Sequence, residues 1–298
     1  MELNIGYFAD GPWSHKTFDK LIHDTEIKIS FICVRYGSKD ETLKNHALKY
    51  KIDYLEHKNV NSDEFILSLK KYDCDLFVSM SFNQIFKNKI INLTKYKIIN
   101  CHAGKLPFYR GRNVLNWVLI NDEKEFGITV HFVDEGIDTG DIISQRSYKI
   151  LDQDNYKTLL EKAYIECANI LYDTILMFKK NSVKTKKQSE LGLNGFYCTQ
   201  RKTGDEILNW NQTSREIFNF VRAICSPGPV ARTFIDKKEM KINKVEFIKD
   251  LPKYKSTIGT ILHVSKNSGS FLVKTQDTYI RVTEYEYGGV LKVGNRFN

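Results

Sequence analysis

Two polar side chains with catalytic potential stand at the end of an expected strand. Asn100 and His102 close the apolar run of residues 97–102, and alternation along a strand places both side chains on the same face. Open α/β sheets bind their ligands at the carboxyl ends of strands, where this pair lies. A carboxamide and a protonated imidazole can both donate hydrogen bonds to an oxygen that gains negative charge. Taken alone, a histidine at a strand end is more often a structural residue.

An acidic, glycine-rich loop follows another expected strand at residues 133–141. It contains Asp138, and a carboxylate close to His102 would favour the imidazolium and hold its ring in orientation. A loop of this composition is usually a solvated turn and occasionally a calcium site. It becomes informative only together with Asn100 and His102.

Together these residues resemble the N10-formyltetrahydrofolate-dependent formyltransferases. The likeness consists of Asn100-x-His102, the run Leu-Pro-Phe-Tyr-Arg-Gly at 106–111, and Asp138 within the Asp-x-Gly-x-Asp-x-Gly of residues 134–140. The family includes glycinamide ribonucleotide, methionyl-tRNA and sugar N-formyltransferases. The resemblance implies N10-formyltetrahydrofolate as the formyl donor and Asn100, His102 and Asp138 as the catalytic residues.

The chemistry of formyl transfer requires such side chains. Attack of an amine on an unreactive formamide creates a tetrahedral oxyanion and a cationic nitrogen, so the site needs hydrogen-bond donors and a route for a proton. Asn100 and a protonated His102 can supply the donors. Either His102 or Asp138, the latter through a water molecule, can accept the proton of the amine, and the sequence leaves both open.

The resemblance also implies where the donor binds. In this family the pterin lies against the end of the fourth strand and against the acidic loop. The donor-binding residues implied in this chain are Met80, Phe82, Ile85, Val133, Asp134 and Gly136. Simple core packing is the alternative explanation for the first three.

The identity of the acceptor amine is a separate question, because the family shares its fold and catalytic residues. Methionyl-tRNA formyltransferases usually carry a long basic insertion after the second strand, whereas residues 34–40 here pass at once into an expected helix. Residues 10–16, 109–117 and 204–210 instead resemble enzymes that formylate nucleotide-linked amino sugars. The resemblance therefore implies a dTDP-, UDP- or GDP-linked amino-deoxy sugar, used for surface polysaccharides such as the O-antigen of lipopolysaccharide.

Arginines offer bidentate donors to a diphosphate of such a substrate. The substrate-binding residues implied are Asp10, Trp13, Lys16, Tyr109, Arg110, Arg112, Tyr197 and Arg201. Nucleic acid is not an expected partner, and a homodimer is a further expectation because dimers are common among relatives. Two alternatives remain open, a methionyl-tRNA formyltransferase and a nucleic-acid-binding module on an inactive formyltransferase scaffold.

The elements that must position these residues alternate between strands and helices. This order predicts a Rossmann-like, mostly parallel α/β sheet, the fold of the formyltransferases, with right-handed crossovers and helices on both faces. Strands are expected at 4–9, 28–35, 53–55, 75–81, 97–102 and 127–133, and helices at 15–23, 42–50, 64–72, 114–121 and 155–179.

The amino-acid composition changes near residue 181, which predicts three regions. They are a catalytic domain over 1–180, a lysine- and serine-rich linker over 181–203, and a smaller β-rich domain over 204–298. The last region is expected to hold one helix, at 214–224, and a small β barrel or sandwich.

Composition and sequence motifs narrow the possible ligands, the cellular location and the class of site. The chain of 298 residues has a net charge of +9, which suits a polyanionic ligand, although a general lysine bias would give the same total. No apolar run approaches the roughly 18–20 residues that span a bilayer. The start of the chain does not read as a signal peptide, and six cysteines lack Cys-x-x-Cys spacing, so we expect a cytoplasmic protein without a metal site. The motifs of dinucleotide, nucleotide-phosphate and serine-hydrolase sites are also absent.

Overall fold

The computed structural model describes residues 2–192 and 194–297, and the chain forms two compact units. The first unit comprises Met1–Gly111, Phe126–Tyr148 and Glu161–Cys198, and the second comprises Arg112–Glu125, Lys149–Leu160 and Thr199–Asn298. The domain boundaries predicted from the sequence, at residues 180 and 203, stay a prediction.

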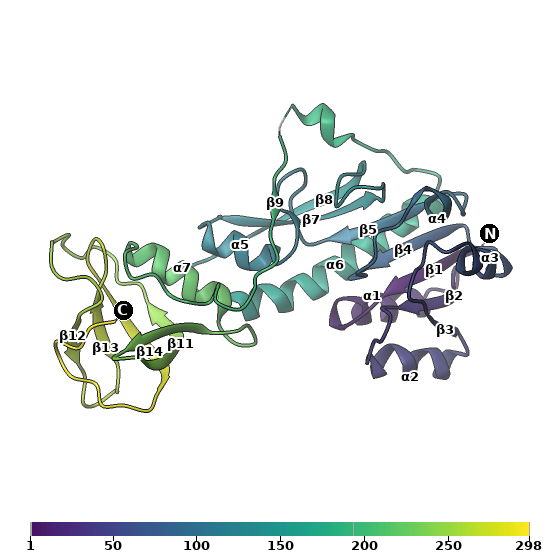
Figure 1. Ribbon diagram of the computed structural model, residues 1–298. Helices are drawn as coiled ribbons and strands as arrows, with labels where there is room; N and C mark the ends of the chain where they lie inside the picture. Colours follow the sequence, from purple (N-terminus) through teal and green to yellow (C-terminus); the bar gives the residue numbers. More distant parts are fainter. Residues whose placement is uncertain (1, 193, 298) are drawn as a thin grey trace. The chain divides into compact units, whose positions relative to one another are not determined.

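The first unit is built on one seven-stranded sheet with the order β3-β2-β1-β4-β5-β7-β8 (Figure 1). Its strands are β1 (Leu3–Ala9), β2 (Ile27–Val34), β3 (Asp53–Glu56), β4 (Leu76–Met80), β5 (Ile98–His102), β7 (Glu125–Phe132) and β8 (Ile142–Lys149). The first five strands pair in parallel, and β7 runs antiparallel to β5. The expected mostly parallel α/β sheet is therefore confirmed, with β8 as an additional edge strand.

Helices connect and cover these strands. They are α1 (Pro12–Ile22), α2 (Glu41–Tyr50), α3 (Asp63–Leu69), the 3₁₀ turn η1 (Lys70–Tyr72), α4 (Asn88–Ile91) and α6 (Tyr156–Lys179). Asp40 and Ser62 begin α2 and α3 as N-caps, since each side chain accepts a hydrogen bond from a backbone N–H three residues on. The long helix α6 lies behind β5, because Cys101 Sγ lies 3.7 Å from the Cys167 carbonyl oxygen. Cys101 thus faces away from Asn100 and His102, as strand alternation predicts.

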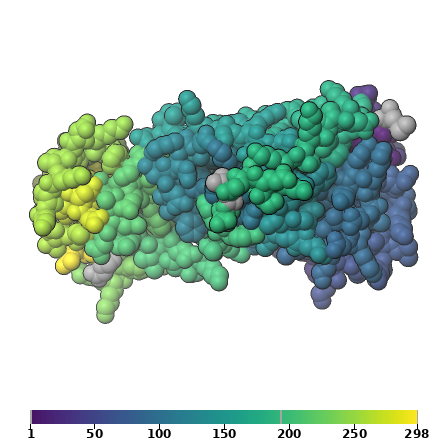
Figure 2. Space-filling model, turned by 90° about the horizontal axis from the view of Figure 1, so that it is seen from above, coloured from purple at the N-terminus to yellow at the C-terminus, as the bar shows by residue number. Residues whose placement is uncertain are grey.

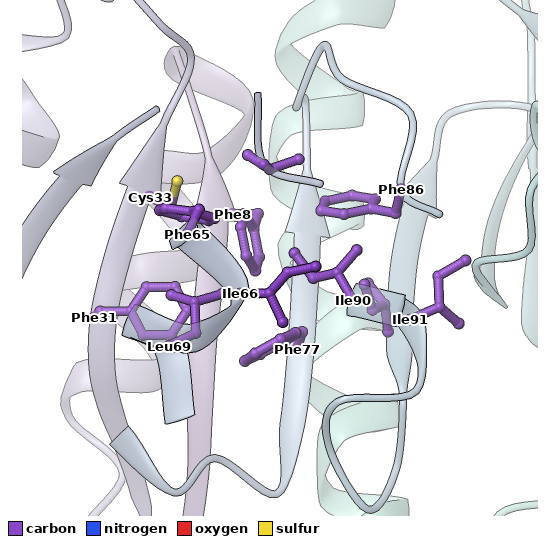
Figure 3. Close-up of a cluster of buried hydrophobic side chains, with 12 residues drawn as sticks. Phe8, Phe31, Cys33, Phe65, Ile66, Leu69, Phe77, Phe86, Ile90 and Ile91 are labelled. Atoms are coloured by element: carbon purple, nitrogen blue, oxygen red, sulfur yellow. The ribbon is translucent and has the colours of Figure 1, made fainter. Parts of the chain in front are cut away.

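A cluster of aromatic rings fills the core beside β1 (Figure 3). Phe8 is fully buried at its centre, and its ring meets four others edge-on at centroid distances of 5.1 to 5.5 Å. These partners are Phe31, Phe77, Phe82 and Phe86. Edge-to-face packing of this kind adds to the stability gained by burying the rings. It fixes the position of β1 and of the chain that leaves β4.

The described residues of 181–192 and 194–203 include two short elements, η2 (Gln188–Leu191) and β9 (Tyr197–Cys198). β9 pairs in parallel with β6 (Arg110–Gly111), the two-residue strand shortly after His102. Figure 2 shows the green part of this segment, near residue 190, on the face of the first unit that is turned to the viewer. Hydrogen bonds therefore tie this segment to the chain that leaves β5.

The second unit combines helices with one five-stranded antiparallel sheet in the order β10-β11-β14-β13-β12. Its elements are α5 (Val114–Ile120), α7 (Ser214–Ile224), β10 (Ala231–Ile235), β11 (Lys238–Glu246), β12 (Ile261–Val264), β13 (Phe271–Lys274) and β14 (Tyr279–Tyr287). Thr213 and Glu216 form a capping box at the start of α7. The expected β-rich C-terminal region is confirmed. In the described part of the chain, no helix has the length and apolar character that crossing a membrane requires.

Candidate active site

The three predicted catalytic residues come together in the first unit. Asn100 and His102 lie on β5, and Asp138 lies in the loop between β7 and β8. His102 Nδ1 is 3.5 Å from Asp138 Oδ2, and about nine-tenths of each side chain is buried. The sequence separates these two residues by a whole strand and a loop, so the fold creates their contact.

A fourth residue, His131, belongs to the same cluster and was not predicted from the sequence. The antiparallel register of β5 and β7 places it opposite Asn100. Its Nε2 lies 3.3 Å from Asn100 Nδ2 and 3.4 Å from Asp138 Oδ1. Its Nδ1 donates to the Phe132 carbonyl oxygen at 2.7 Å, because a carbonyl oxygen can only accept. In the neutral ring Nε2 therefore accepts from the amide of Asn100, whereas in the protonated ring Nε2 donates to Asp138.

His102 is held at both ring nitrogens. Its Nε2 donates to the Tyr109 carbonyl oxygen at 2.7 Å, while Nδ1 faces Asp138. Tyr109 has the left-handed φ of 55°, and a Cβ on Gly104 would overlap both the Tyr109 oxygen and His102 Nε2. Glycine at 104 therefore permits the close approach of the ring to this carbonyl. His102 can reach a reacting oxygen only by sharing or exchanging one of these contacts, so Asn100 is the more direct oxyanion donor.

Asp138 is a buried carboxylate with several hydrogen-bond and charge partners. Burial alone would raise its pKa, but His102, His131 and the Gly111 backbone N–H outweigh that effect and hold the pKa well below its usual range. The Gly111 N–H donates to Asp138 Oδ2 at 2.8 Å. A carboxylate with so low a pKa is a weak base, which favours an orienting role over direct acceptance of the proton. Its φ of 55° is also unusual for a residue other than glycine.

The segments expected to hold the donor lie next to each other. The Asn88 backbone N–H donates to Glu135 Oε1 at 3.3 Å, which joins the chain after β4 to the acidic loop. Ile85 and Ile137, one from each of these segments, both expose about half of their surface. Binding of the pterin by Ile85 stays a prediction.

Other members of the predicted donor site have partners of their own. Met80 is buried at the end of β4, while Phe82 and Val133 pack against the aromatic core cluster. Asp134 accepts hydrogen bonds from Gly136 N and Thr139 Oγ1, at 3.1 and 2.6 Å, and so closes its own loop. Their contacts with the donor stay a prediction.

Three of the predicted substrate-binding residues lie beside the catalytic cluster. Tyr109 supplies the carbonyl that binds His102, and Tyr197, half exposed, lies with its ring centroid 5.6 Å from the guanidinium carbon of Arg110. Arg110 also donates to Gln188 Oε1 through Nε and Nη2, at 3.2 and 2.6 Å. An open hollow of about 520 Å³ lies here, and its lining residues are Arg110, Thr139, Asp141, Lys187, Gln188, Ser189, Asn194 and Gly195. The sequence predicted only Arg110 among them.

Arg112 and Arg201 belong to the second unit. Arg112 Nη1 donates to Gln200 Oε1 at 2.9 Å. The guanidinium of Arg201 lies 5.6 Å from the ring centroids of both Trp117 and Phe220, and burial lowers its pKa. The structure therefore gives each of these arginines a partner within its own unit, and their contact with a substrate stays a prediction.

The three predicted substrate residues after β1 have different surroundings. Asp10 is buried, and its Oδ2 accepts from the Arg35 backbone N–H at 3.3 Å. Trp13 packs edge-on against Tyr164 at 4.8 Å. Lys16 is exposed on α1. Asp10 follows β1 directly, at the carboxyl edge of the sheet, whereas Trp13 and Lys16 lie on α1. Contacts of these three residues with a substrate stay a prediction.

The connections after β1 and β2 are held together by a half-buried hydrogen bond between His15 and Asp40. His15 Nε2 lies 2.8 and 2.9 Å from the two carboxylate oxygens of Asp40. Asp40 also accepts from Gly11 N at 2.7 Å and from Leu43 N at 3.1 Å. Burial alone would raise the pKa of Asp40, but His15 and the two N–H groups outweigh it and lower the pKa.

Asp40→Ala should destabilise the protein at neutral pH by about 1–2 kcal/mol, because it removes a helix cap as well as the hydrogen bond to His15. The pKa of Asp40 is lower in the folded than in the unfolded chain. Its contribution is therefore complete above about pH 4 and is lost as the pH falls through the folded pKa. Urea unfolding of the native chain and the variant at pH 7 and near pH 3 measures this. A free-energy difference that stays constant with pH would contradict the account.

The comparisons with known proteins agree with this geometry. Residues 30–175 match the model of the formyl transferase family, and residues 201–292 match the model of the formyl transferase C-terminal domain. A methionyl-tRNA formyltransferase of Thermodesulfovibrio yellowstonii is 33% identical over 241 residues, which cover 80% of this chain and 74% of the relative.

Two solved sugar-modifying enzymes share the fold. The crystal structure of WlaRD, a sugar 3N-formyl transferase with dTDP and 5-N-formyl-THF, matches with a TM-score of 0.70 at 22% identity and covers 98% of this chain and 100% of that one. An N-formyltransferase from Helicobacter canadensis, in complex with folinic acid and dTDP-3-aminofucose, matches with a TM-score of 0.69 at 20% identity and covers 96% and 100%.

Proposed function

Because this chain belongs to the formyl transferase family and is a formyl-transferring enzyme, we propose that its acceptor is the amino group of a nucleotide-linked amino-deoxy sugar. The formyl donor is N10-formyltetrahydrofolate, which supplies the formyl carbon that the amine attacks. Formation of a homodimer stays a prediction. We place the reaction in a reducing compartment such as the cytoplasm, because all six cysteines are unpaired.

The observation that carries the choice of acceptor is the short connection between β2 and α2. β2 ends at Val34 and α2 begins at Glu41, with Asp40 as its cap. This leaves no room for the long basic insertion with which methionyl-tRNA formyltransferases usually contact the acceptor arm. Full-length matches to two sugar N-formyltransferase structures support the same choice at the level of the fold.

Formylation of methionyl-tRNA is the second candidate function. The sequence similarity to a methionyl-tRNA formyltransferase and the net charge of +9 favour it. A binding module on an inactive scaffold is the third, and the close assembly of His102 with Asp138 speaks against it, since mere binding does not require such a cluster.

We assign separate tasks to the catalytic residues. As the amine attacks, Asn100 donates an N–H to the developing oxyanion, because an amide nitrogen carries two hydrogens and only one is needed for His131. Asp138 orients His102 and stabilises the proton that Nδ1 receives, because a neutral ring with its hydrogen on Nε2 leaves Nδ1 able to accept one. His102 is the better candidate to accept the proton of the amine, because Asp138 has too low a pKa to be an effective base.

The acceptor is testable with purified protein and N10-formyltetrahydrofolate. Release of tetrahydrofolate is measured with dTDP-, UDP- and GDP-linked amino sugars and with initiator methionyl-tRNA, each alone. We expect kcat/KM for one nucleotide sugar to exceed that for the tRNA by at least about a hundredfold. Turnover with the tRNA alone would contradict the sugar proposal, and turnover with neither would support the binding module.

A further inference from the structure

We propose that Gln188 is a positioning residue, whose side chain locks the Asp138 loop to the chain after His102 so that Asp138 stays in line with both histidines. The proposal rests on the catalytic role proposed for Asp138 and is independent of which amine is formylated. Gln188 lies in η2, within the segment for which the sequence predicts a linker.

The side chain of Gln188 is buried and uses its full hydrogen-bonding capacity. Its Nε2 donates to the carbonyl oxygens of Asp138 and Gly140, at 2.9 and 2.8 Å. Its Oε1 accepts from Nε and Nη2 of Arg110, at 3.2 and 2.6 Å. A carboxamide offers two donor hydrogens and two acceptor lone pairs, so all four are engaged. Only 5% of the residue is exposed.

These hydrogen bonds connect Gln188, Arg110 and Asp138 in a closed network beside the Asp138 carboxylate. Gln188 holds the backbone of Asp138 on one side and the side chain of Arg110 on the other. Gly111, which follows Arg110, donates its N–H to Asp138 Oδ2 at 2.8 Å. The same glutamine therefore fixes both ends of the hydrogen bond that orients the carboxylate. Since Asp138 has a left-handed φ of 55°, its loop needs such external support.

Gln188 is itself held in place by the chain on both sides of it. Before it, Lys186 and Ile142 exchange two backbone hydrogen bonds of 2.9 and 2.8 Å. After it, β9 pairs with β6, and Phe196 packs edge-on against Tyr109 at 4.9 Å. Tyr109 is the residue whose carbonyl binds His102. The segment thus supports both partners of His102.

The chemistry of the position calls for glutamine. Glutamate would keep the two acceptor contacts with Arg110 but would place a carboxylate against two carbonyl oxygens, without a hydrogen to give them. Alanine would remove all four contacts. The pair Gln188→Ala and Gln188→Glu therefore separates support of the Asp138 loop from the anchoring of Arg110.

We expect Gln188→Ala to lower kcat about ten- to a hundredfold, with little change in the KM for N10-formyltetrahydrofolate, because misplacement of the catalytic group affects the transition state more than binding. Gln188→Glu should be equally impaired. Titration of the Asp138 carboxyl by ¹³C NMR should show its pKa rising towards the ordinary range in both variants. This readout needs no acceptor, so it stands even where the proposed acceptor is wrong.

The control is Gln153→Ala, the same change at an exposed glutamine, which should leave kcat and the Asp138 titration unchanged. Normal kcat in Gln188→Glu would overturn the proposal, because anchoring of Arg110 would then be sufficient. An unchanged Asp138 titration in Gln188→Ala would overturn it as well. So would a loss of activity that matches the unfolded fraction measured by thermal denaturation, because that would indicate a role in folding alone.

Discussion

Replacing Asn100 with alanine is expected to lower kcat about a hundred- to a thousandfold without unfolding the protein, the effect typical of removing one oxyanion donor. The expectation follows from the position of its amide, which His131 holds at 3.3 Å at the carboxyl edge of the sheet. His102→Ala should be impaired to a similar degree, because it removes the group oriented by Asp138. Steady-state kinetics on the preferred acceptor measures both effects.

Matched controls are the changes Asn267→Ala and His263→Ala, which remove the same side chains at exposed positions of the second unit. Both should retain native kcat. The double variant Asn100→Ala/His102→Ala should lose less than the product of the two single effects, because residues that act as a unit are not additive. Independent, multiplicative losses would contradict the idea that one hydrogen-bonded cluster carries the reaction.

Asp138→Asn is expected to lower kcat by about two to four orders of magnitude. The amide removes the negative charge that faces His102 and His131, and it can turn a donor N–H towards the Gly111 N–H, which needs an acceptor. The change is close to isosteric, so the loop should keep its course. The control Asp236→Asn alters an exposed aspartate with a similar left-handed φ, of 47°. This variant should fold normally and keep the native kcat.

The same variant has a predictable pH dependence of stability. The pKa of Asp138 lies well below its usual range in the folded protein, so the carboxylate stabilises the fold at every pH above about 4, its unfolded value. That contribution is lost as the pH falls through the folded pKa. The difference in unfolding free energy between the native chain and Asp138→Asn should therefore shrink on acidification. A difference that grew as the pH fell would contradict the sign of the shift.

The sequence contained enough information to predict one face of this site. Period-two alternation alone places Asn100 and His102 together on β5, and the carboxyl end of a strand is where such sheets bind ligands. The strand–helix order likewise predicted the parallel part of the sheet. The sequence analysis missed β8 because only its first two residues, Ile142 and Ile143, are aliphatic, as an edge strand allows.

The site residues that the sequence analysis missed owe their roles to contacts with residues far away in the sequence. His131 faces Asn100 only through the register of β5 and β7, which no local pattern specifies. Gln188 lies 50 residues from Asp138 and 78 from Arg110 in the chain, within a lysine- and serine-rich stretch typical of a linker. Local composition cannot indicate that such a side chain will be buried.

The most direct test of the proposed function is a competition for a labelled formyl group. The protein is given N10-[¹³C]formyltetrahydrofolate together with a mixture of nucleotide-linked amino sugars and initiator methionyl-tRNA, and mass spectrometry locates the label. We predict that the label is found on one nucleotide sugar, and that Asn100→Ala slows its transfer about a hundred- to a thousandfold. Label on the tRNA alone, or transfer to the sugar at an undiminished rate in Asn100→Ala, would contradict the account.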